Sequence, residues 1–337
     1  MLSGPQDKEE VARTPGVSWE MVTRRLRGLA ARALRGPAGH AITAQPQPQG
    51  PPVRPRQTYA PPARSLLITG CSSGIGLDAA RTLRARGWRV IATCRKPADC
   101  ARLAAEGLES FPLDLADAAS VAAGAAEALA RTEGRLDAVF NNGAFAIPGA
   151  VEDLPRAALH EIFETNLFGH LDLTNRLLPS MRAAGSGRVV MNSSVLGILA
   201  LRWRGAYVAT KFALEGITDA LRLELAGSGV QVVLIEPGPI GTLIRANSIP
   251  HFERHIDQAR SAHRAVYEGV LRQRLYEPAT VRDRFELPPS AVTARLIEAL
   301  ESPRPRARYR VTRPTLLAEA ARRLLPTALR DRLVGGR

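Results

Sequence analysis

The stretch Ser65-Leu-Leu-Ile-Thr-Gly-Cys-Ser-Ser-Gly-Ile-Gly76 places a short apolar run directly before a glycine-rich turn. The run Ser65–Thr69 has the length and composition of a buried parallel strand. A helical pattern from Leu77 to Arg86 follows the turn. Glycines let a backbone approach phosphate groups closely, and a helix N-terminus offers free N–H groups and the positive end of the helix dipole. The stretch therefore predicts a strand–turn–helix unit that binds the pyrophosphate of a dinucleotide.

Apolar runs that alternate with helical patterns continue this arrangement along the chain. Further strands are predicted at Trp88–Cys94, just before Phe111, and at Leu136–Phe140, Arg188–Ser193, Val230–Ile235 and Tyr309–Thr312. Long helices are predicted over residues 152–184, from Tyr207 onward, and over Pro288–Leu300. Such alternation favours a parallel sheet with helices on both faces. We therefore expect an α/β fold of the Rossmann type, a doubly wound sheet of seven mostly parallel strands.

Tyr207 and Lys211 stand four residues apart in Tyr-Val-Ala-Thr-Lys, at the start of a predicted helix. Residues with this spacing share one helix face, about one turn apart. A free tyrosine has a pKa of about 10, and an ammonium group beside it stabilises the phenolate and lowers that pKa. The pair can therefore act as a general acid or base. Taken alone, the pattern equally fits an ordinary, partly exposed helix, so its interpretation depends on the rest of the chain.

Several motifs occur in the order, and on the elements, typical of one family. They are Thr69-Gly-Cys-Ser-Ser-Gly-Ile-Gly76, Asn141-Asn-Gly-Ala144, Ser193-Ser194, Tyr207-Val-Ala-Thr-Lys211 and Pro237-Gly-Pro-Ile-Gly-Thr242. Together they resemble the single-domain short-chain dehydrogenases/reductases. The first is especially similar to that of NADP-dependent hydroxysteroid and retinol dehydrogenases and of bacterial aldehyde reductases. The family usually shows Asn-Asn-Ala-Gly where this chain has Asn-Asn-Gly-Ala. The resemblance covers about Ser65 to Val311.

The resemblance implies four catalytic residues. Tyr207 would donate a proton to a carbonyl oxygen, Ser194 would hold that oxygen, Lys211 would lower the tyrosine pKa, and Asn166 would hold a water in a proton relay. Ser194 precedes Tyr207 by the 13 positions usual in the family, which favours it over Ser193. The resemblance also assigns the cofactor to Gly70, Ser72, Ser73, Gly74, Ile75, Gly76, Arg95, Asp114, Leu115, Asn141, Gly143, Tyr207, Lys211, Pro237, Gly238, Ile240 and Thr242.

The end of the second predicted strand decides between NAD and NADP. A carboxylate there would hold the ribose 2′-hydroxyl of NAD, whereas an arginine would accept the 2′-phosphate of NADP. This chain has Cys94-Arg95-Lys96 and no acid. An arginine–phosphate contact is charge-assisted and can be bidentate, and the resemblance adds Ser73 to it. We therefore expect NADP(H) as the cofactor, and no metal.

Three features of the sequence each allow more than one interpretation. Asp114 either bonds the adenine, as the resemblance implies, or caps a helix that begins at Ala116. Residues 243–286 form either a lid over an apolar pocket or a segment packed on the sheet. The amphipathic, basic C-terminal tail, residues 313–337, closes the pocket, dimerises or touches a membrane.

An apolar neighbourhood predicts a hydrophobic substrate. Its candidate residues are Phe145, Ile147, Leu196, Leu199 and Trp203. We expect an enzyme that interconverts an aldehyde, a retinoid or a steroid-like ketone with its alcohol. The alternatives are a 3-oxoacyl reductase and, from another class, a non-catalytic NADP-binding regulatory or scaffold protein, although a pure binder would not need Tyr207. The resemblance also implies a homo-oligomer formed through the helices that bear Asn166 and Tyr207.

The composition fits one large domain with extensions. The chain has 337 residues, of which 45% are hydrophobic, and a formal net charge of +14. It has no apolar run of about 18 residues, so no transmembrane helix is expected. The charge leaves a peripheral membrane contact open, but no motif indicates nucleic acid. Three cysteines without metal-ligand spacing suit a reducing compartment, and we expect the cytoplasm.

Residues 1–64 are predicted to be a disordered extension rich in proline and basic residues. Gln45–Pro62 is dense in Pro and Gln, which indicates a flexible linker. Ser18–Leu34 could form a basic amphipathic helix for a membrane surface or a transit peptide, although a functionally silent extension is favoured. The predicted domains are thus residues 1–64, the Rossmann domain at 65–312, and a helical tail at 313–337.

Overall fold

The computed structural model describes residues 64–277 and 285–335. The predictions for residues 1–64 therefore fall outside the described residues, except at Arg64. Within the described part, no helix is both long and apolar enough to cross a membrane.

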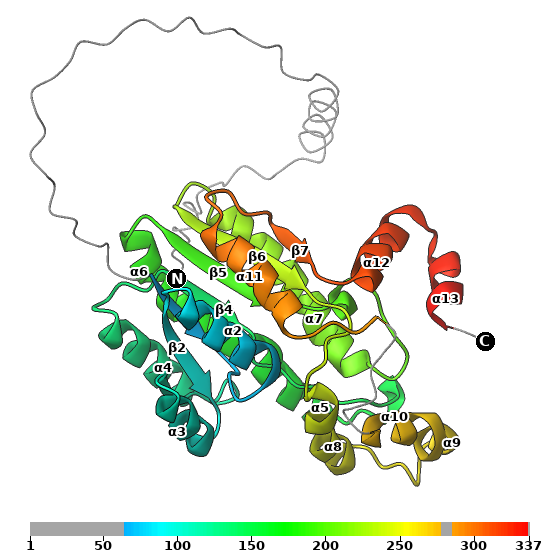
Figure 1. The fold of residues 1–337 in the computed structure, drawn as a ribbon. Coiled ribbons are helices and arrows are strands. Elements are labelled where there is room, and N and C mark those ends of the chain that lie inside the picture. Colours follow the sequence, from blue (N-terminus) through cyan, green and yellow to red (C-terminus); the bar gives the residue numbers. More distant parts are fainter. Residues whose placement is uncertain (1–63, 278–284, 336–337) are drawn as a thin grey trace, which may run out of the picture. The chain divides into compact units, whose positions relative to one another are not determined.

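One seven-stranded sheet organises the described residues, and all its neighbouring strands run parallel. The strand order is β3-β2-β1-β4-β5-β6-β7, so the winding reverses between β1 and β4 (Figure 1). The strands are β1 (Ser65–Ile68), β2 (Arg89–Cys94), β3 (Glu109–Pro112), β4 (Ala138–Asn141), β5 (Gly187–Asn192), β6 (Val230–Glu236) and β7 (Arg308–Arg310). The predicted doubly wound fold is confirmed.

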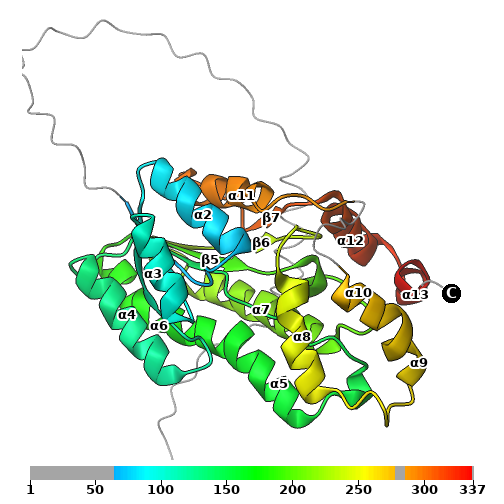
Figure 2. The same cartoon turned by 60° about the horizontal axis from the view of Figure 1, so that its bottom comes forward.

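Helices cover both faces of this sheet, as the two views in Figures 1 and 2 show. One face carries α2 (Gly74–Ala85), α3 (Pro97–Ala105) and α11 (Ser290–Glu301). The other carries α4 (Ala118–Arg131), α6 (Gly169–Ala183) and α7 (Gly205–Glu224). Each layer buries its own apolar cluster, because side chains alternate between the two faces of a strand. Leu66 and Ile68 belong to the first cluster, and Leu67 belongs to the second.

The helix predicted over residues 152–184 is divided into pieces. A 3-10 turn η1 (Val151–Asp153) precedes α5 (Arg156–Phe163), and a π-helical turn η2 (Glu164–Phe168) joins α5 to α6. The π turn contains Asn166. Single π turns inside α-helices frequently mark functional sites, and the apolar periodicity of the sequence does not reveal this one.

One predicted helix boundary was wrong for a local reason. Helix α4 begins at Ala118 rather than Ala116, because Asp117 is its N-cap and its Oδ1 accepts the Ala119 N–H at 2.9 Å. Asp114 therefore does not cap that helix. The C-terminal tail, predicted to be helical, consists of two helices in the described part, α12 (Arg313–Leu324) and α13 (Thr327–Gly335). Pro326 separates them, because proline cannot continue an i→i−4 hydrogen-bond pattern.

The segment after β6 forms α8 (Ile244–His255), α9 (Arg264–Val266), the π turn η4 (Tyr267–Leu271) and α10 (Arg272–Tyr276). It has its own buried cluster, whose members include Phe252, Tyr267 and Leu275. The Tyr267 hydroxyl accepts the Ala150 N–H at 2.8 Å and donates to Asp153 Oδ2 at 2.5 Å. This segment packs on the body of the domain and contributes Ile249 to the lining of the cavity described below. Its predicted role as a lid stays a prediction, and residues 278–284 of it lie outside the described residues.

Candidate active site

A cavity of about 1150 Å³ lies at the carboxyl ends of the strands, where ligands bind in open α/β sheets. The loops after β1, β4, β5 and β6 line it, together with α7 and parts of α8 and α10. It brings together most of the residues predicted from the sequence, namely Gly70, Ser72, Ser73, Gly74, Ile75, Gly143, Ser194, Tyr207, Lys211, Pro237, Gly238, Ile240 and Thr242. One cavity thus joins the glycine-rich turn to the tyrosine–lysine pair.

The glycine-rich turn has no room for a side chain at Gly70 or Gly76. A Cβ on Gly76 would lie 2.3 Å from the Gly70 carbonyl oxygen, and a Cβ on Gly70 would lie 2.7 Å from Gly143 Cα. Gly70 and Gly74 also have φ values of +72° and +57°, which L side chains rarely adopt. The result is a bare stretch of backbone that opens onto the cavity at the N-terminus of α2. This arrangement fits a phosphate-bearing cofactor.

Hydrogen bonds clamp this turn to the end of β4. Thr69 Oγ1 accepts the N–H groups of Asn142 and Gly143 at 2.9 and 3.0 Å. Asn142 Nδ2 donates back to the carbonyl oxygens of Thr69 and Gly70 at 3.0 and 3.3 Å. The swapped Gly143-Ala144 order leaves this contact intact, because the bonds use the asparagine side chain and the backbone.

Tyr207 and Lys211 are both buried in the first turns of α7. Lys211 Nζ donates to the Asn192 carbonyl oxygen at 2.8 Å and lies 5.5 Å from the centroid of the Tyr207 ring. Burial raises the pKa of Tyr207 to about 12, although a hydrogen bond with Ser194 opposes this shift. Burial also lowers the pKa of Lys211 to about 8, although Glu215 opposes that shift. At pH 7 the pair is therefore a neutral phenol beside an ammonium group.

Ser193 and Ser194 directly follow β5 and have different neighbours. Ser194 Oγ lines the cavity and accepts the Leu196 N–H at 3.1 Å. Ser193 also lines the cavity, and its buried Oγ approaches Glu215 without a hydrogen bond to any described residue. Gly197 makes this approach possible, because a Cβ there would lie 2.7 Å from Ser193 Oγ and 3.1 Å from Glu215 Oε1. Both serines line the cavity, so the choice of Ser194 rests on its spacing to Tyr207 and stays a prediction.

Asn166 is fully buried and its side chain is occupied. Its Oδ1 accepts the Phe145 N–H at 3.1 Å, and its Nδ2 donates to the Phe145 carbonyl oxygen at 2.9 Å and to Thr210 Oγ1 at 3.3 Å. It thereby ties the π turn η2 to the loop after β4 and to α7. Asn166 does not line the cavity, so its predicted part in a proton relay stays a prediction.

His170 is a buried residue of the site region that the sequence reasoning missed. Its Nε2 lies 2.7 Å from the Gly143 carbonyl oxygen, and its Nδ1 lies 3.3 Å from Asn141 Oδ1. Burial and the nearby Lys211 lower its pKa to about 3, so the ring is neutral. Asn141 itself donates to Thr174 Oγ1 at 2.9 Å. His170 therefore supports the backbone of the loop that lines the cavity. Its role could not be predicted from the sequence, because a lone histidine within a helical pattern does not indicate which loop it contacts.

The other predicted cofactor residues lie away from the cavity lining, namely Gly76, Arg95, Asp114, Leu115 and Asn141. Arg95 is exposed just after β2, and none of the described carboxylates forms an ion pair with it. Asp114 Oδ1 accepts the Ala116 N–H at 3.0 Å and thus closes a local turn. Leu115 and Asn141 are buried beneath the loops.

The predicted apolar wall was only partly right. Leu196 lines the cavity, whereas Phe145, Ile147, Leu199 and Trp203 do not. Phe145 and Ile147 pack inward in a buried cluster that also contains Tyr207. The apolar side chains that do line this part of the cavity come mainly from the segment after β6 and include Leu243, Ile244, Ile249 and Leu275. Arg204, Arg245 and Arg274 lie among them.

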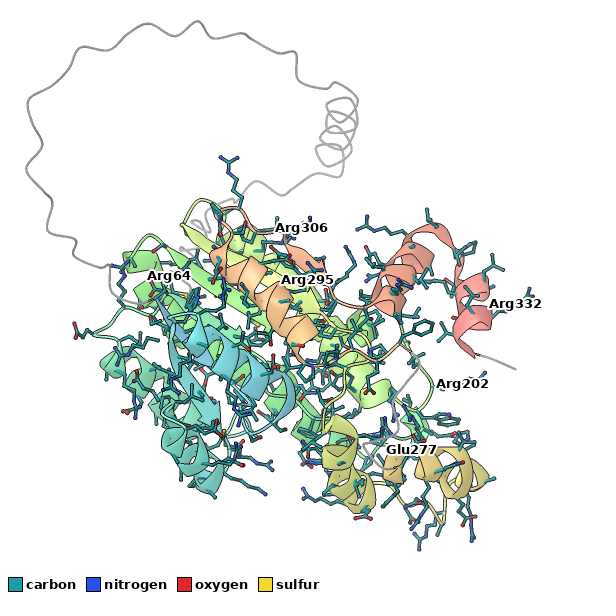
Figure 3. All side chains as sticks on the ribbon, in the orientation of Figure 1. Arg64, Arg202, Glu277, Arg295, Arg306 and Arg332 are labelled. Atoms are coloured by element: carbon teal, nitrogen blue, oxygen red, sulfur yellow. The ribbon has the colours of Figure 1, made fainter. Side chains whose placement is uncertain are left out.

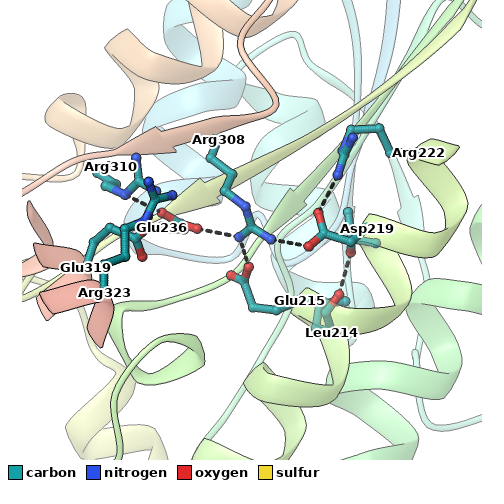
Figure 4. Close-up of polar contacts among 10 residues, drawn as sticks. Leu214, Glu215, Asp219, Arg222, Glu236, Arg308, Arg310, Glu319 and Arg323 are labelled. Carbon is teal, nitrogen blue, oxygen red and sulfur yellow. Dashed lines mark hydrogen bonds and ion pairs between the residues drawn. The ribbon is translucent and has the colours of Figure 1, made fainter. Parts of the chain in front are cut away.

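A charged cluster lies next to the site, at the β6–β7 edge (Figure 4). Arg308 on β7 contacts Glu215 and donates to Glu236 Oε1 and Asp219 Oδ2, each at 2.6 Å. Glu236 is fully buried and directly precedes Pro237. Glu215 stands one helical turn after Lys211. The cluster therefore connects the short edge strand β7 to both the helix and the turn that form the site.

A family model described as short chain dehydrogenase matches residues 64–251. This match covers more than half of the chain, and the fold and the Ser-Tyr-Lys site agree with it. The chain therefore belongs to the short-chain dehydrogenase/reductase family, and it is an NAD(P)-dependent oxidoreductase that acts on CH–OH groups.

Individual relatives agree with this assignment. The chain is 40% identical to the uncharacterized oxidoreductase YbbO of Escherichia coli K12, over 81% of this chain and 94% of that protein. It is 31% identical to the NADPH-dependent 3-dehydrocapnine reductase of Ornithobacterium rhinotracheale, over 80% and 95%. Among solved structures, a short-chain dehydrogenase from Streptomyces avermitilis matches with a TM-score of 0.64 and 29% identity, over 83% and 97%.

Proposed function

We propose that this protein is an NADP(H)-dependent oxidoreductase that interconverts a hydrophobic carbonyl compound and its alcohol. The observation that carries the proposal is the single cavity that Ser194, Tyr207 and Lys211 share with the glycine-rich turn. A non-catalytic binding protein would need the turn but would not need a buried tyrosine hydroxyl beside a lysine at the same cavity.

We propose that the residues assigned from the sequence hold the two ends of the cofactor. The bare turn Gly70–Gly76 would hold the pyrophosphate, and Pro237, Gly238, Ile240 and Thr242 would hold the nicotinamide end. Asp114, Leu115, Asn141 and Gly143 would support the adenosine half. When bound, the nicotinamide supplies or accepts the hydride. The protein supplies orientation and the handling of the proton.

The proton chemistry falls to Tyr207. A phenol whose pKa is raised to about 12 is protonated at pH 7, so it can donate to a carbonyl oxygen during reduction. Ser194 lines the same part of the cavity and would hold that oxygen through a hydrogen bond. The Lys211 ammonium stabilises the phenolate that is left. Asn166 would hold a water that returns the proton through Lys211.

Arg95 supports NADP(H) rather than NAD(H). It is the first residue after β2, it is exposed, and no described carboxylate pairs with it. It is thus free to meet a 2′-phosphate, and Ser73 at the N-cap of α2 lies at the cavity to assist. A relative of this chain, the 3-dehydrocapnine reductase, is described as NADPH-dependent.

The apolar residues around the active end of the cavity support a hydrophobic substrate, such as an aldehyde, a retinoid or a steroid-like ketone. Leu196, Leu201, Leu243, Ile249 and Leu275 line it. A 3-oxoacyl reductase is the alternative, because the same cavity could accept an acyl chain.

We also propose a homo-oligomer in the cytoplasm. Phe168 on η2 and Ile217 and Leu223 on α7 are exposed apolar side chains on the helices that carry Asn166 and Tyr207. Cys71, Cys94 and Cys100 are free and buried, which suits a reducing compartment. Light scattering on the purified protein tests the first part, and a monomer at micromolar concentration would contradict it.

The test of function is NADPH oxidation with a panel of apolar aldehydes and ketones, including 3-oxoacyl thioesters. We expect turnover with the wild-type protein and a loss of about 10²–10⁴-fold in Tyr207→Phe. Tyr309→Phe is the matched control, because Tyr309 lies on the edge strand β7 away from the cavity. Undiminished turnover in Tyr207→Phe would contradict the mechanism, and preferential turnover of thioesters would favour the alternative.

A further inference from the structure

Arg204 is a cation of the cavity wall that the proposed reaction does not use. It directly precedes α7, and Arg204, Tyr207 and Lys211 have the i, i+3, i+7 spacing of one helix face. Because an α-helix rises 1.5 Å per residue, Arg204 and Tyr207 are separated by only about 4.5 Å along the axis. Arg204, Tyr207 and Ser194 all line the same cavity.

The side chain of Arg204 has no partner among the described residues. No hydrogen bond or ion pair joins its guanidinium to residues 64–277 or 285–335. Its backbone bridges to Gly149, and its carbonyl oxygen accepts the Val208 N–H at 2.9 Å. These backbone contacts need no arginine, so they do not explain the side chain.

The surroundings of Arg204 are cationic. Burial lowers the pKa of its guanidinium, and Arg274 and Arg245 lower it further. Arg245 Nη1 pairs with Glu277 Oε2 at 3.1 Å, and Arg274 contacts the same carboxylate oxygen. Glu277, labelled in Figure 3, thus pairs with Arg245 and Arg274, and no carboxylate in the described part of the chain pairs with Arg204. A partly desolvated cation of this kind is costly unless it meets an anion.

The other carboxylates at the cavity are engaged elsewhere. Asp78 accepts a hydrogen bond from Thr293, and Glu286 lies against Gly241, where a Cβ would be 2.9 Å from its Oε1. The side chains on the same wall as Arg204 are mostly apolar, including Leu201, Ile249 and Leu275. A ligand that suits this wall has an apolar body and an oxyanion close to its reacting carbonyl.

We infer that Arg204 is a specificity-determining residue that binds an acidic group of the substrate, so that the physiological substrate is an amphipathic oxo-acid or hydroxy-acid. The inference rests on the proposed function for the position of the reacting carbonyl. A guanidinium forms bidentate, charge-assisted hydrogen bonds with a carboxylate, and it also binds sulfonate or phosphate oxygens. The neutral aldehydes and ketones of the proposed function would then be minor substrates.

The first experiment measures binding rather than turnover, by calorimetry on the full-length protein with NADP⁺. The probes are octanoate, octane-1-sulfonate and octan-1-ol, which share one chain and differ in the head group. We expect one or both anions to bind at least about tenfold more tightly than the alcohol, the size of a hydrogen bond to a charged group. The relative affinities of octanoate and octane-1-sulfonate show whether a carboxylate or a sulfonate suits the site better. Equal affinity for all three probes, or no binding of either anion, overturns the inference.

Arg204→Gln removes the positive charge and keeps a long polar side chain. Arg204→Lys keeps the positive charge but loses the bidentate hydrogen-bonding geometry of the guanidinium. We expect the anion preference to vanish in Arg204→Gln and to survive in part in Arg204→Lys. Arg202→Gln is the matched control, because Arg202 is exposed two residues away and does not line the cavity (Figure 3). An anion preference retained in Arg204→Gln overturns the inference. NADPH affinity, measured by fluorescence titration, should be unchanged in all three variants, and a loss confined to the Arg204 variants would assign the residue to the cofactor and overturn it too.

A second experiment compares kcat/KM for 8-oxooctanoate with that for its methyl ester. We expect the acid to be preferred by about tenfold or more in the wild-type protein and the ratio to approach one in Arg204→Gln. Reduction of the ester with no preference for the acid overturns the inference and leaves the proposed function standing. If neither aldehyde is reduced, the proposed function fails, and the binding experiment still decides the role of Arg204.

Discussion

Arg308 Nη1 on the short edge strand β7 donates to Glu236 Oε1 at the end of β6, at 2.6 Å (Figure 4). Glu236 is buried, and Pro237 and Gly238 of the predicted nicotinamide turn follow it directly. A Cβ on Gly238 would lie 2.1 Å from Thr312 Oγ1. The C-terminal end of the domain is therefore part of the support of the site, although it is more than a hundred residues from Tyr207 in the sequence.

Replacing Arg308 with methionine should destabilise the protein strongly. The variant leaves the buried Glu215 without its arginine partner and leaves the buried Glu236 with Arg310 alone, at 3.3 Å. Removing one partner of a buried ion pair costs about 3–5 kcal/mol. The free energy of unfolding in urea measures the effect. The control is Arg295→Met, because Arg295 pairs with Glu298 on the exposed surface of α11, where such pairs contribute about 0–1 kcal/mol. Similar losses in the two variants would contradict this account of the cluster.

Glu215→Gln should move the pH profile of carbonyl reduction. Burial lowers the pKa of Lys211 to about 8, and the Glu215 carboxylate raises it against that effect. Without this negative charge Lys211 loses its proton at a lower pH, so the alkaline limb of kcat/KM should shift to lower pH. A merely structural role for Glu215 would lower activity at every pH equally. Glu224→Gln, at the exposed end of the same helix, is the control and should leave the profile in place.

Gly76→Ala and Gly216→Ala should have opposite effects, although both glycines lie in helices. In α2, a Cβ on Gly76 would press into the Gly70 carbonyl at 2.3 Å, so the variant should distort the turn and lose NADPH affinity. In α7, a Cβ on Gly216 would meet no atom within 4 Å. Alanine there should stabilise the protein by about 0.5–1 kcal/mol through helix propensity. Fluorescence titration with NADPH and thermal unfolding measure the two effects. Normal cofactor affinity in Gly76→Ala would contradict the assignment of the turn.

Arg95→Gln should raise the Kd for NADPH by about tenfold, because it removes a charge-assisted contact with the 2′-phosphate. The Kd for NADH should stay the same, since that cofactor carries no such phosphate. Arg86→Gln is the control, because Arg86 is held by Glu301 on the surface. Equal weakening of both cofactors would indicate a structural effect, and no change for NADPH would remove Arg95 from the cofactor site.

Much of the fold could be predicted because its determinants are local. The apolar run Ser65–Ile68, the glycines at 70, 74 and 76, and the four-residue spacing of Tyr207 and Lys211 each act through neighbours in the chain. The break at Pro326 was also local and was missed. The start of α4 was misplaced because Asp114 and Asp117 are both good capping residues, and only the folded backbone shows which of them meets a free N–H.

The sequence by itself determined the family, the strand–turn–helix unit and the shared helix face of Tyr207 and Lys211, because short-range spacing decides which side chains share a turn or a helix face. Only the tertiary structure decided which side chains meet across the sheet. In the folded structure Phe145 and Trp203 do not line the cavity, and the side chain of Asn166 is hydrogen-bonded to its neighbours. Arg308 contacts both Glu215 and Glu236 there, although the three residues lie on three separate elements. The tertiary structure also left the Arg204 side chain at the cavity without a partner among residues 64–277 and 285–335. The physical reason is that packing and charge pairing depend on distances between segments, which no local pattern encodes.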